Sequence, residues 1–104
     1  MKLLNAFSLN MLSCLPASIR IEEISLEQAR TILQAGFESA VGHANTAAVF
    51  SEQLGITVMA ERITISLSQS DRVIVGQYRG PRLEEGAVSL PEGATIQWIL
   101  ISVS

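Results

Sequence analysis

The segment from residue 95 to residue 103 is apolar on both of its alternating faces. Ile96, Trp98 and Leu100 would lie on one side of an extended chain, and Ile99 and Ile101 on the other. A strand with two apolar faces must be covered on both sides, which is typical of the interior of a sheet. We therefore expect 95–103 to be a central strand with other structure packed over each face.

Several other segments have the character of strands. Residues 2–9, 18–24 and 62–67 alternate apolar and polar side chains. Residues 72–78 are expected to return as a strand, and 87–89 adds a further short strand. The polar run Ser68-Gln69-Ser70-Asp71 predicts a turn, so 62–78 is expected to form a hairpin. Residues 79–86, which contain Gly80-Pro81, are expected to form a polar loop.

Two helices are predicted between the second and third strands. Ser25 and Gln28 have the spacing of a capping box, and the apolar residues that follow share one helical face up to Gly36. A second helix is predicted over 43–54, ending at Gly55, after a short connection at 37–42. The order indicates one α/β domain over residues 1–104, with a mixed sheet of about five strands and helices packed on it.

Composition narrows the range of partners. Charged residues make up 16% of the chain, below the roughly 25% of an average globular protein, and the mean hydropathy is +0.36. Surplus apolar surface favours an oligomer. The net charge of −3 disfavours a partner that is duplex nucleic acid. The apolar runs are too short to span a membrane, so we expect a cytoplasmic protein with no membrane partner.

Several kinds of chemistry are excluded by counting. The chain has one histidine, one aspartate and one cysteine, Cys14, so it forms no internal disulfide and lacks the ligands of a zinc or two-metal site. We expect Cys14 to be a buried structural thiol. No phosphate-binding glycine loop or nucleophile-elbow motif is present, and neither a metal nor a cofactor is expected.

His43 is the first residue that could carry chemistry. It follows Gly42 and stands where the second helix begins, at the end that carries partial positive charge and unpaired N–H groups. A histidine there could meet a phosphate. The plainer alternative is that His43 only caps the helix.

Two further polar segments could hold a ligand. The loop after residue 77 combines Gln77, Arg79 and Arg82 with Glu84 and Glu85, although it would also suit a solvated loop with an Arg–Glu pair. Near the N-terminus, Asn5 precedes Ser8 and Asn10, which alternate on one face of the expected first strand. That arrangement would equally suit an edge strand with one wet face.

Five segments, in this order, resemble the viral anti-CRISPR ring nucleases. They are Asn5-Ala6-Phe7-Ser8-Leu9-Asn10-Met11-Leu12, Val41-Gly42-His43 leading into Thr46, Arg62-Ile63, Gln77, and Arg82-Leu83-Glu84-Glu85-Gly86. The resemblance implies a homodimer that binds cyclic tetra-adenylate, the messenger of type III CRISPR defence. It also implies a metal-independent cleavage into linear di-adenylates with 2′,3′-cyclic phosphate ends, which switches the signal off.

The resemblance also implies roles for individual residues. His43 would be the general acid, Arg82 would bind phosphate, and Glu85 would be the acidic residue near the histidine. The implied ligand-binding residues are Asn5, Ser8, Asn10, Gly42, Arg62, Gln77 and Arg79. Arg79 is included because the stretch between Gln77 and Arg82 is one residue longer than in the family, so either arginine could hold the phosphate.

Two alternatives stand beside this enzyme. One is a protein that sequesters the ring without cutting it, and the other is a structural or DNA-associated viral protein of the same fold. The presence of both His43 and Glu85 favours the enzyme, and the acidic net charge disfavours DNA binding.

Overall fold

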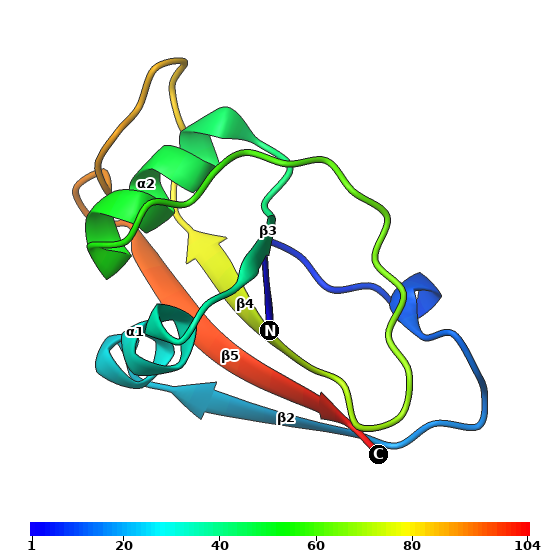
Figure 1. The fold of residues 1–104 in the computed structure, drawn as a ribbon. Coiled ribbons are helices and arrows are strands. Elements are labelled where there is room, and N and C mark those ends of the chain that lie inside the picture. Colours follow the sequence, from blue (N-terminus) through cyan, green and yellow to red (C-terminus); the bar gives the residue numbers. More distant parts are fainter.

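The computed structural model describes residues 1–104 as a five-stranded mixed sheet with two helices on one face (Figure 1). The elements in chain order are β1 (Lys2–Leu4), the 3₁₀ turn η1 (Leu9–Met11), β2 (Ile19–Ile24), α1 (Leu26–Gln34), β3 (Glu38–Ala40), α2 (Ala44–Leu54), β4 (Arg72–Arg79) and β5 (Thr95–Val103). The predicted α/β class, the mixed five-stranded sheet and the packed helices are confirmed.

The strand order β2-β5-β4-β1-β3 decides which chain segments meet. β5 pairs antiparallel with β2 and β4, so the strand that is apolar on both faces lies in the interior, as predicted. β1 runs parallel to both β3 and β4. Parallel strands end at the same edge of a sheet, so the residues that follow β1 and β3, whose last residues Leu4 and Ala40 pair, are brought together there.

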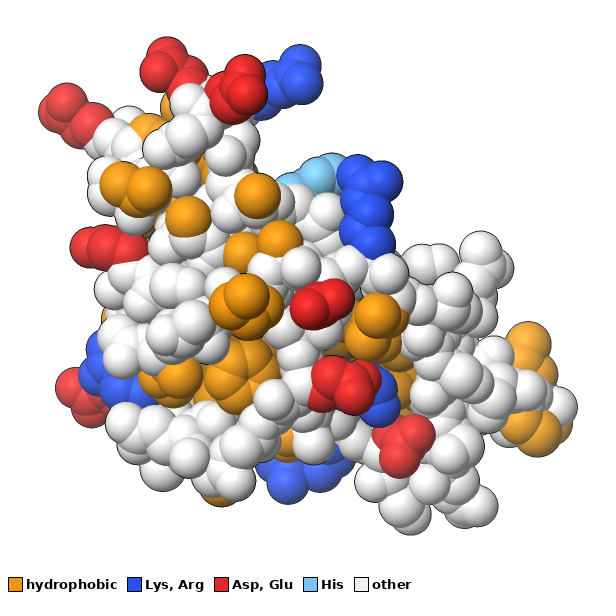
Figure 2. Space-filling model, turned by 45° about the horizontal axis from the view of Figure 1, so that its top comes forward, with side chains coloured by type: hydrophobic (Ala, Val, Ile, Leu, Met, Phe, Trp, Pro, Cys, Tyr) orange, Lys and Arg blue, Asp and Glu red, His pale blue; other side chains and the backbone are white.

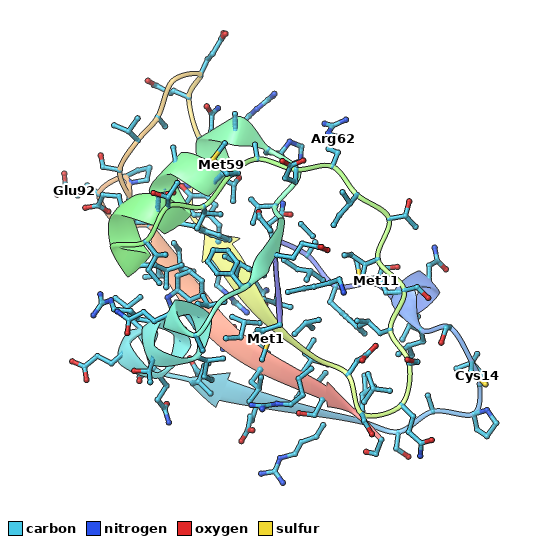
Figure 3. All side chains as sticks on the ribbon, viewed as in Figure 1. Met1, Met11, Cys14, Met59, Arg62 and Glu92 are labelled. Carbon is cyan, nitrogen blue, oxygen red and sulfur yellow. The ribbon has the colours of Figure 1, made fainter.

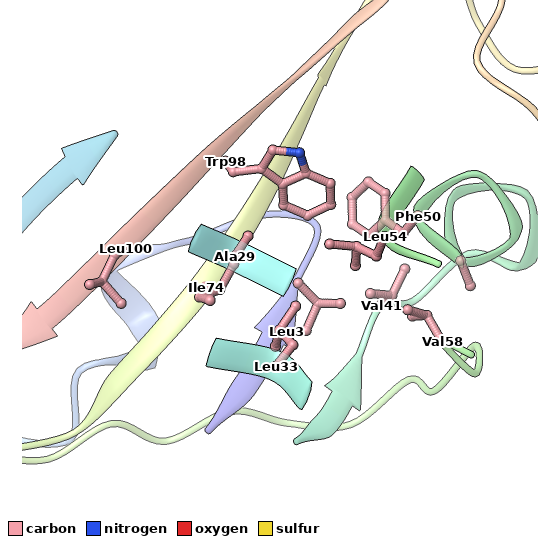
Figure 4. Close-up of a cluster of buried hydrophobic side chains, with 11 residues drawn as sticks. Leu3, Ala29, Leu33, Val41, Phe50, Leu54, Val58, Ile74, Trp98 and Leu100 are labelled. Atoms are coloured by element: carbon pink, nitrogen blue, oxygen red, sulfur yellow. The ribbon is translucent and has the colours of Figure 1, made fainter. Parts of the chain in front are cut away.

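The sheet separates two apolar cores. On the helix face, Phe50 of α2 packs against Trp98 of β5, with ring centroids 5.1 Å apart and the rings inclined by 58° (Figure 4). On the other face, Val73, Val75 and Ile101 are covered by Ile65 and Leu67 and by the chain that follows β1. Each alternating face of the inner strands therefore has its own cover.

Both helices begin and end as their residues predict. Ser25 Oγ accepts from the backbone N–H of Gln28 at 3.0 Å, and Gln28 Oε1 accepts from the Ser25 N–H at 2.8 Å, which completes the capping box. α2 ends at Gly55, whose φ of +68° lies in the left-handed region that glycine tolerates.

Four predictions about extended segments are wrong. Residues 62–67 form no strand and no hairpin: the only ladder contact in the stretch is an isolated bridge between Leu67 and Leu12. The alternation arises because Ile65 and Leu67 enter the second core, and such burial needs no backbone partner. The first strand ends at Leu4 rather than continuing to residue 9, the connection 37–42 contains β3, and 87–89 is not a strand.

Cys14 corrects another expectation, because its side chain is exposed rather than buried. It lies on the loop between η1 and β2, at the periphery of the molecule (Figure 3).

Gly76 of β4 has no room for a side chain. A Cβ there would lie 2.5 Å from Phe50 Cζ and 2.8 Å from Trp98 Cζ3, in the middle of the helix-face core. We expect Gly76→Ala to lower the free energy of unfolding by roughly 1–3 kcal/mol, as overpacking does, measured by urea denaturation. Gly42→Ala is the matched control, because its Cβ would meet only Arg62 Cγ at 3.5 Å. Equal stability of wild type and Gly76→Ala would contradict this packing.

The lowered pKa of Asp71 predicts that the stability of the fold depends on pH. Its carboxylate accepts from the Ser68 backbone N–H at 2.8 Å, which holds the pKa of Asp71 below its ordinary value of 3.8. A lowered pKa stabilises the fold above the ordinary value, and that contribution is lost as the pH falls through the folded-state pKa. Asp71→Asn should therefore be less stable than wild type near about pH 6 and lose this deficit near about pH 2. Thermal unfolding across this range checks it, and a deficit independent of pH would contradict it.

Candidate functional site

The ends of β1 and β3 are joined through Asn5 and Gly42. The Gly42 N–H donates to Asn5 Oδ1 at 3.3 Å, and Arg62 Nε donates to the Gly42 carbonyl oxygen at 3.0 Å. Three of the predicted ligand-binding residues thus meet around one glycine, although they come from parts of the chain far apart in sequence. In open α/β sheets, ligands bind at this carboxyl edge of the parallel strands.

Two cavities open beside this cluster and share the wall formed by Asn5 and Ala6. The first, of about 350 Å³, lies between the ends of β1 and β3 and the segment 61–65, and includes Gly42 and Arg62 in its lining. The second, of about 420 Å³, lies on the sheet face opposite the helices and includes Gln77. Asn5 therefore stands between the two, with Gly42 and Arg62 on one side and Gln77 on the other.

His43 follows Gly42 directly and is the N-cap residue of α2. Its side chain is exposed and makes no capping hydrogen bond. The alternative, in which His43 only caps the helix, therefore has no side-chain hydrogen bond in its favour. No acidic residue lies in the first turn of α2 to offset the partial positive charge of that end. Figure 2 shows the histidine at the surface beside a cationic side chain. This helix end is suited to an anion such as phosphate.

The loop between β4 and β5 carries the remaining charged candidates. Arg79 Nη2 donates to Gln97 Oε1 at 3.3 Å, so it lies along the neighbouring strand. Arg82 and Glu85 are exposed and form no ion pair with each other or with His43, because the only pair within 4.0 Å joins Arg20 to Glu22. The Arg–Glu pair considered for this loop is therefore absent.

Ser8 and Asn10 lie in a different setting from the one predicted. They do not alternate on a strand: Ser8 caps η1, and its Oγ accepts from the Asn10 N–H at 3.2 Å. Neither residue lines the two cavities beside Asn5. The structure thus brings Asn5, Gly42, His43 and Arg62 together and places Ser8 and Asn10 outside that cluster.

Sequence reasoning missed one residue at this edge. Asn45, in the first turn of α2, accepts from the Gly86 N–H through Oδ1 at 3.1 Å and so joins the β4–β5 loop to the helix. The preference of asparagine for hydrogen bonds at helix starts was the available signal, but the partner lies 41 residues away in sequence. No group of three or more His, Cys, Asp or Glu side chains is placed to hold a metal ion.

The fold belongs to a defined class of small α/β domain. The STIV B116-like family model matches residues 1–97, and the chain is a member of that family. Among solved structures it is similar to B116 of Sulfolobus turreted icosahedral virus, with 25% sequence identity, 97% of each chain covered and a TM-score of 0.83. A search of curated proteins found no match. None of the helices has the length and apolar character to cross a bilayer.

The Asn5–Gly42 contact gives a local prediction. Asn5→Ala removes the acceptor of the Gly42 N–H, and a neutral hydrogen bond of about 1 kcal/mol corresponds to roughly fivefold faster amide exchange. Hydrogen exchange at Gly42, followed by NMR, measures the change. Asn10→Ala is the control, because no hydrogen bond of the Asn10 side chain is present. Unchanged exchange in Asn5→Ala would mean that the contact does not hold the two strand ends together.

Proposed function

We propose that the protein is a metal-independent phosphodiesterase that cuts cyclic tetra-adenylate into linear di-adenylates and so switches off type III CRISPR signalling. The observation that carries the proposal is the open N-terminus of α2, with His43 exposed next to the Asn5–Gly42–Arg62 cluster. A phosphodiester placed there would meet a helix end, an arginine and an imidazole together. The ring itself as substrate comes from the resemblance of the five sequence segments.

The proposed reaction needs no bound group beyond the chain and the ring. The ribose 2′-oxygen attacks the adjacent phosphorus, an O2′–P bond forms, and the P–O5′ bond breaks. Protonated His43 donates its proton to the departing 5′-oxygen, and the 2′-hydroxyl proton leaves to water. The products carry a 2′,3′-cyclic phosphate and a 5′-hydroxyl. The helix end and a nearby arginine would stabilise the charge that develops on the phosphate.

Arginine forks suit the recognition of a phosphate group. Arg62 uses Nε toward Gly42, which leaves its two terminal nitrogens for a phosphate oxygen. Arg79 is engaged with Gln97, whereas Arg82 forms no ion pair. Of the two arginines considered for the scissile phosphate, we therefore assign that role to Arg82, with Glu85 as the acidic residue near His43.

A homodimer is part of the proposal. The sheet face opposite the helices leaves Ile21 58% exposed, and apolar side chains form most of the lining of the 420 Å³ cavity on that face. A second copy would cover such a surface. A ring of four identical nucleotides matches a two-fold assembly, since each copy then supplies one histidine for one cut.

A protein that sequesters the ring is the second candidate. It is favoured by one observation, the lack of an ion pair between His43 and Glu85. A DNA-associated role is disfavoured by the net charge of −3, because DNA-binding surfaces are cationic.

The decisive experiment incubates the purified protein with cyclic tetra-adenylate in excess EDTA, beside His43→Ala and a Gln34→Ala control on the exposed end of α1. We expect wild type and the control to yield di-adenylate with a 2′,3′-cyclic phosphate, and His43→Ala to be slower by about 10²–10⁴-fold. Chromatography identifies the products. An intact ring that co-elutes with wild type would establish sequestration, and an intact unbound ring would contradict both candidates.

A further inference from the structure

The β4–β5 loop, residues 80–94, is attached to the rest of the protein by a single hydrogen bond beyond its own hairpin. Tyr78 Oη donates to the Pro81 carbonyl oxygen at 2.6 Å, and the Ala87 and Ala94 N–H groups donate within the loop. Only the Gly86 N–H reaches another element, at Asn45 of α2. In Figure 1 the loop rises past α2 and away from the sheet.

Apolar packing does little to fix the position of this loop. Gly80 approaches Ala94 so closely that a Cβ would lie 2.6 Å from the alanine Cβ, which fixes the base of the loop. Farther along, Val88 is 66% exposed, while Leu83 and Leu90 are half-buried. Such contacts permit sliding, whereas the amide-to-Oδ1 bond selects one position for the tip.

The bond lies between the two residues that the proposed chemistry pairs. Asn45 is two residues after His43 on the first turn of α2, and Gly86 directly follows Glu85. Gly86 has a φ of +83° and space around its Cα, so its backbone can turn the N–H toward the helix. Chain connectivity therefore keeps the Glu85 backbone near the start of α2 for as long as the Asn45 bond holds.

We propose that Asn45 is a positioning residue that holds the β4–β5 loop at the N-terminus of α2, so that Glu85 is presented to the His43 site. This inference rests on the proposed function. Asn45 acts through the loop and touches no reacting atom. Without its Oδ1, the exposed tip of the loop would sample many positions, and Glu85 would reach the site in only a fraction of them.

The test compares wild type with Asn45→Ala and Asn45→Asp, and uses Gln34→Ala as control. The alanine variant loses the acceptor, whereas the aspartate variant keeps a side-chain oxygen at the same position. We expect Gly86 amide exchange to be about fivefold faster in Asn45→Ala and kcat for ring cleavage to fall roughly tenfold or more with KM little changed. Asn45→Asp should restore the exchange rate only, because its negative charge in the first turn of α2 opposes phosphate binding. The thermal midpoint should be nearly the same in every variant, because the bond lies at the exposed edge of the fold.

Each outcome is decisive. Gly86 exchange that is unchanged in Asn45→Ala overturns the tether, and faster exchange with an unchanged kcat overturns the positioning role. Gly86 exchange that Asn45→Asp does not restore, or a fall in kcat in Asn45→Ala that accompanies a lowered thermal midpoint, assigns the effect to α2 itself and also overturns it. A wild type that leaves the ring intact refutes the proposed function and the catalytic part of this inference. The exchange rate, which needs no substrate, separates that failure from failure of the tether.

Discussion

The insertion of β1 between β4 and β3 is the constraint on which the rest of the structure depends. β1 has only three residues, yet Leu3 and Leu4 are both almost wholly buried, one in each core. The strand therefore joins the two cores and pairs in parallel with a neighbour on each side. Its end at Leu4 places Asn5 at the carboxyl edge of the sheet, next to the residue that follows β3.

Every feature of the candidate site follows from that edge. The Asn5 side chain binds Gly42, Gly42 leads to His43, and His43 begins the helix whose N-terminus is open. The same helix start binds the β4–β5 loop through Asn45. A short buried strand thus determines the position of an otherwise exposed polar cluster. The two apolar cores contain no buried polar or charged residue.

Much of the fold could be predicted because its signals are local. The capping box fixes the start of α1, Gly55 fixes the end of α2, and the double-faced apolar pattern identifies β5. The failures have a common cause in long-range contacts. The apolar–polar alternation at 62–67 arises because Ile65 and Leu67 are buried against the sheet face, and not because the segment pairs as a strand. β3 is hidden because Glu38-Ser39-Ala40 has weak strand character, and it becomes a strand only by pairing with β1.

In the candidate site, too, local features could be predicted and long-range contacts could not. His43 at a helix start is readable from its neighbours, whereas the meeting of Asn5, Gly42 and Arg62 depends on strand order and could be expected only through the resemblance. Ser8 and Asn10 were expected on a strand face, but a 3₁₀ turn forms there because Ser8 caps it. Asn45 carries no sequence signal that names its partner in the loop.

We propose that two copies of this strand-edge site share one cyclic tetra-adenylate. Native mass spectrometry of the His43→Ala protein, with the ring added in increasing amounts, tests it most directly because cleavage no longer removes the ligand. We expect one species with the mass of two chains plus one ring, and no species with a second ring. A complex of one chain with one ring, or a protein that takes up no ring, would contradict it.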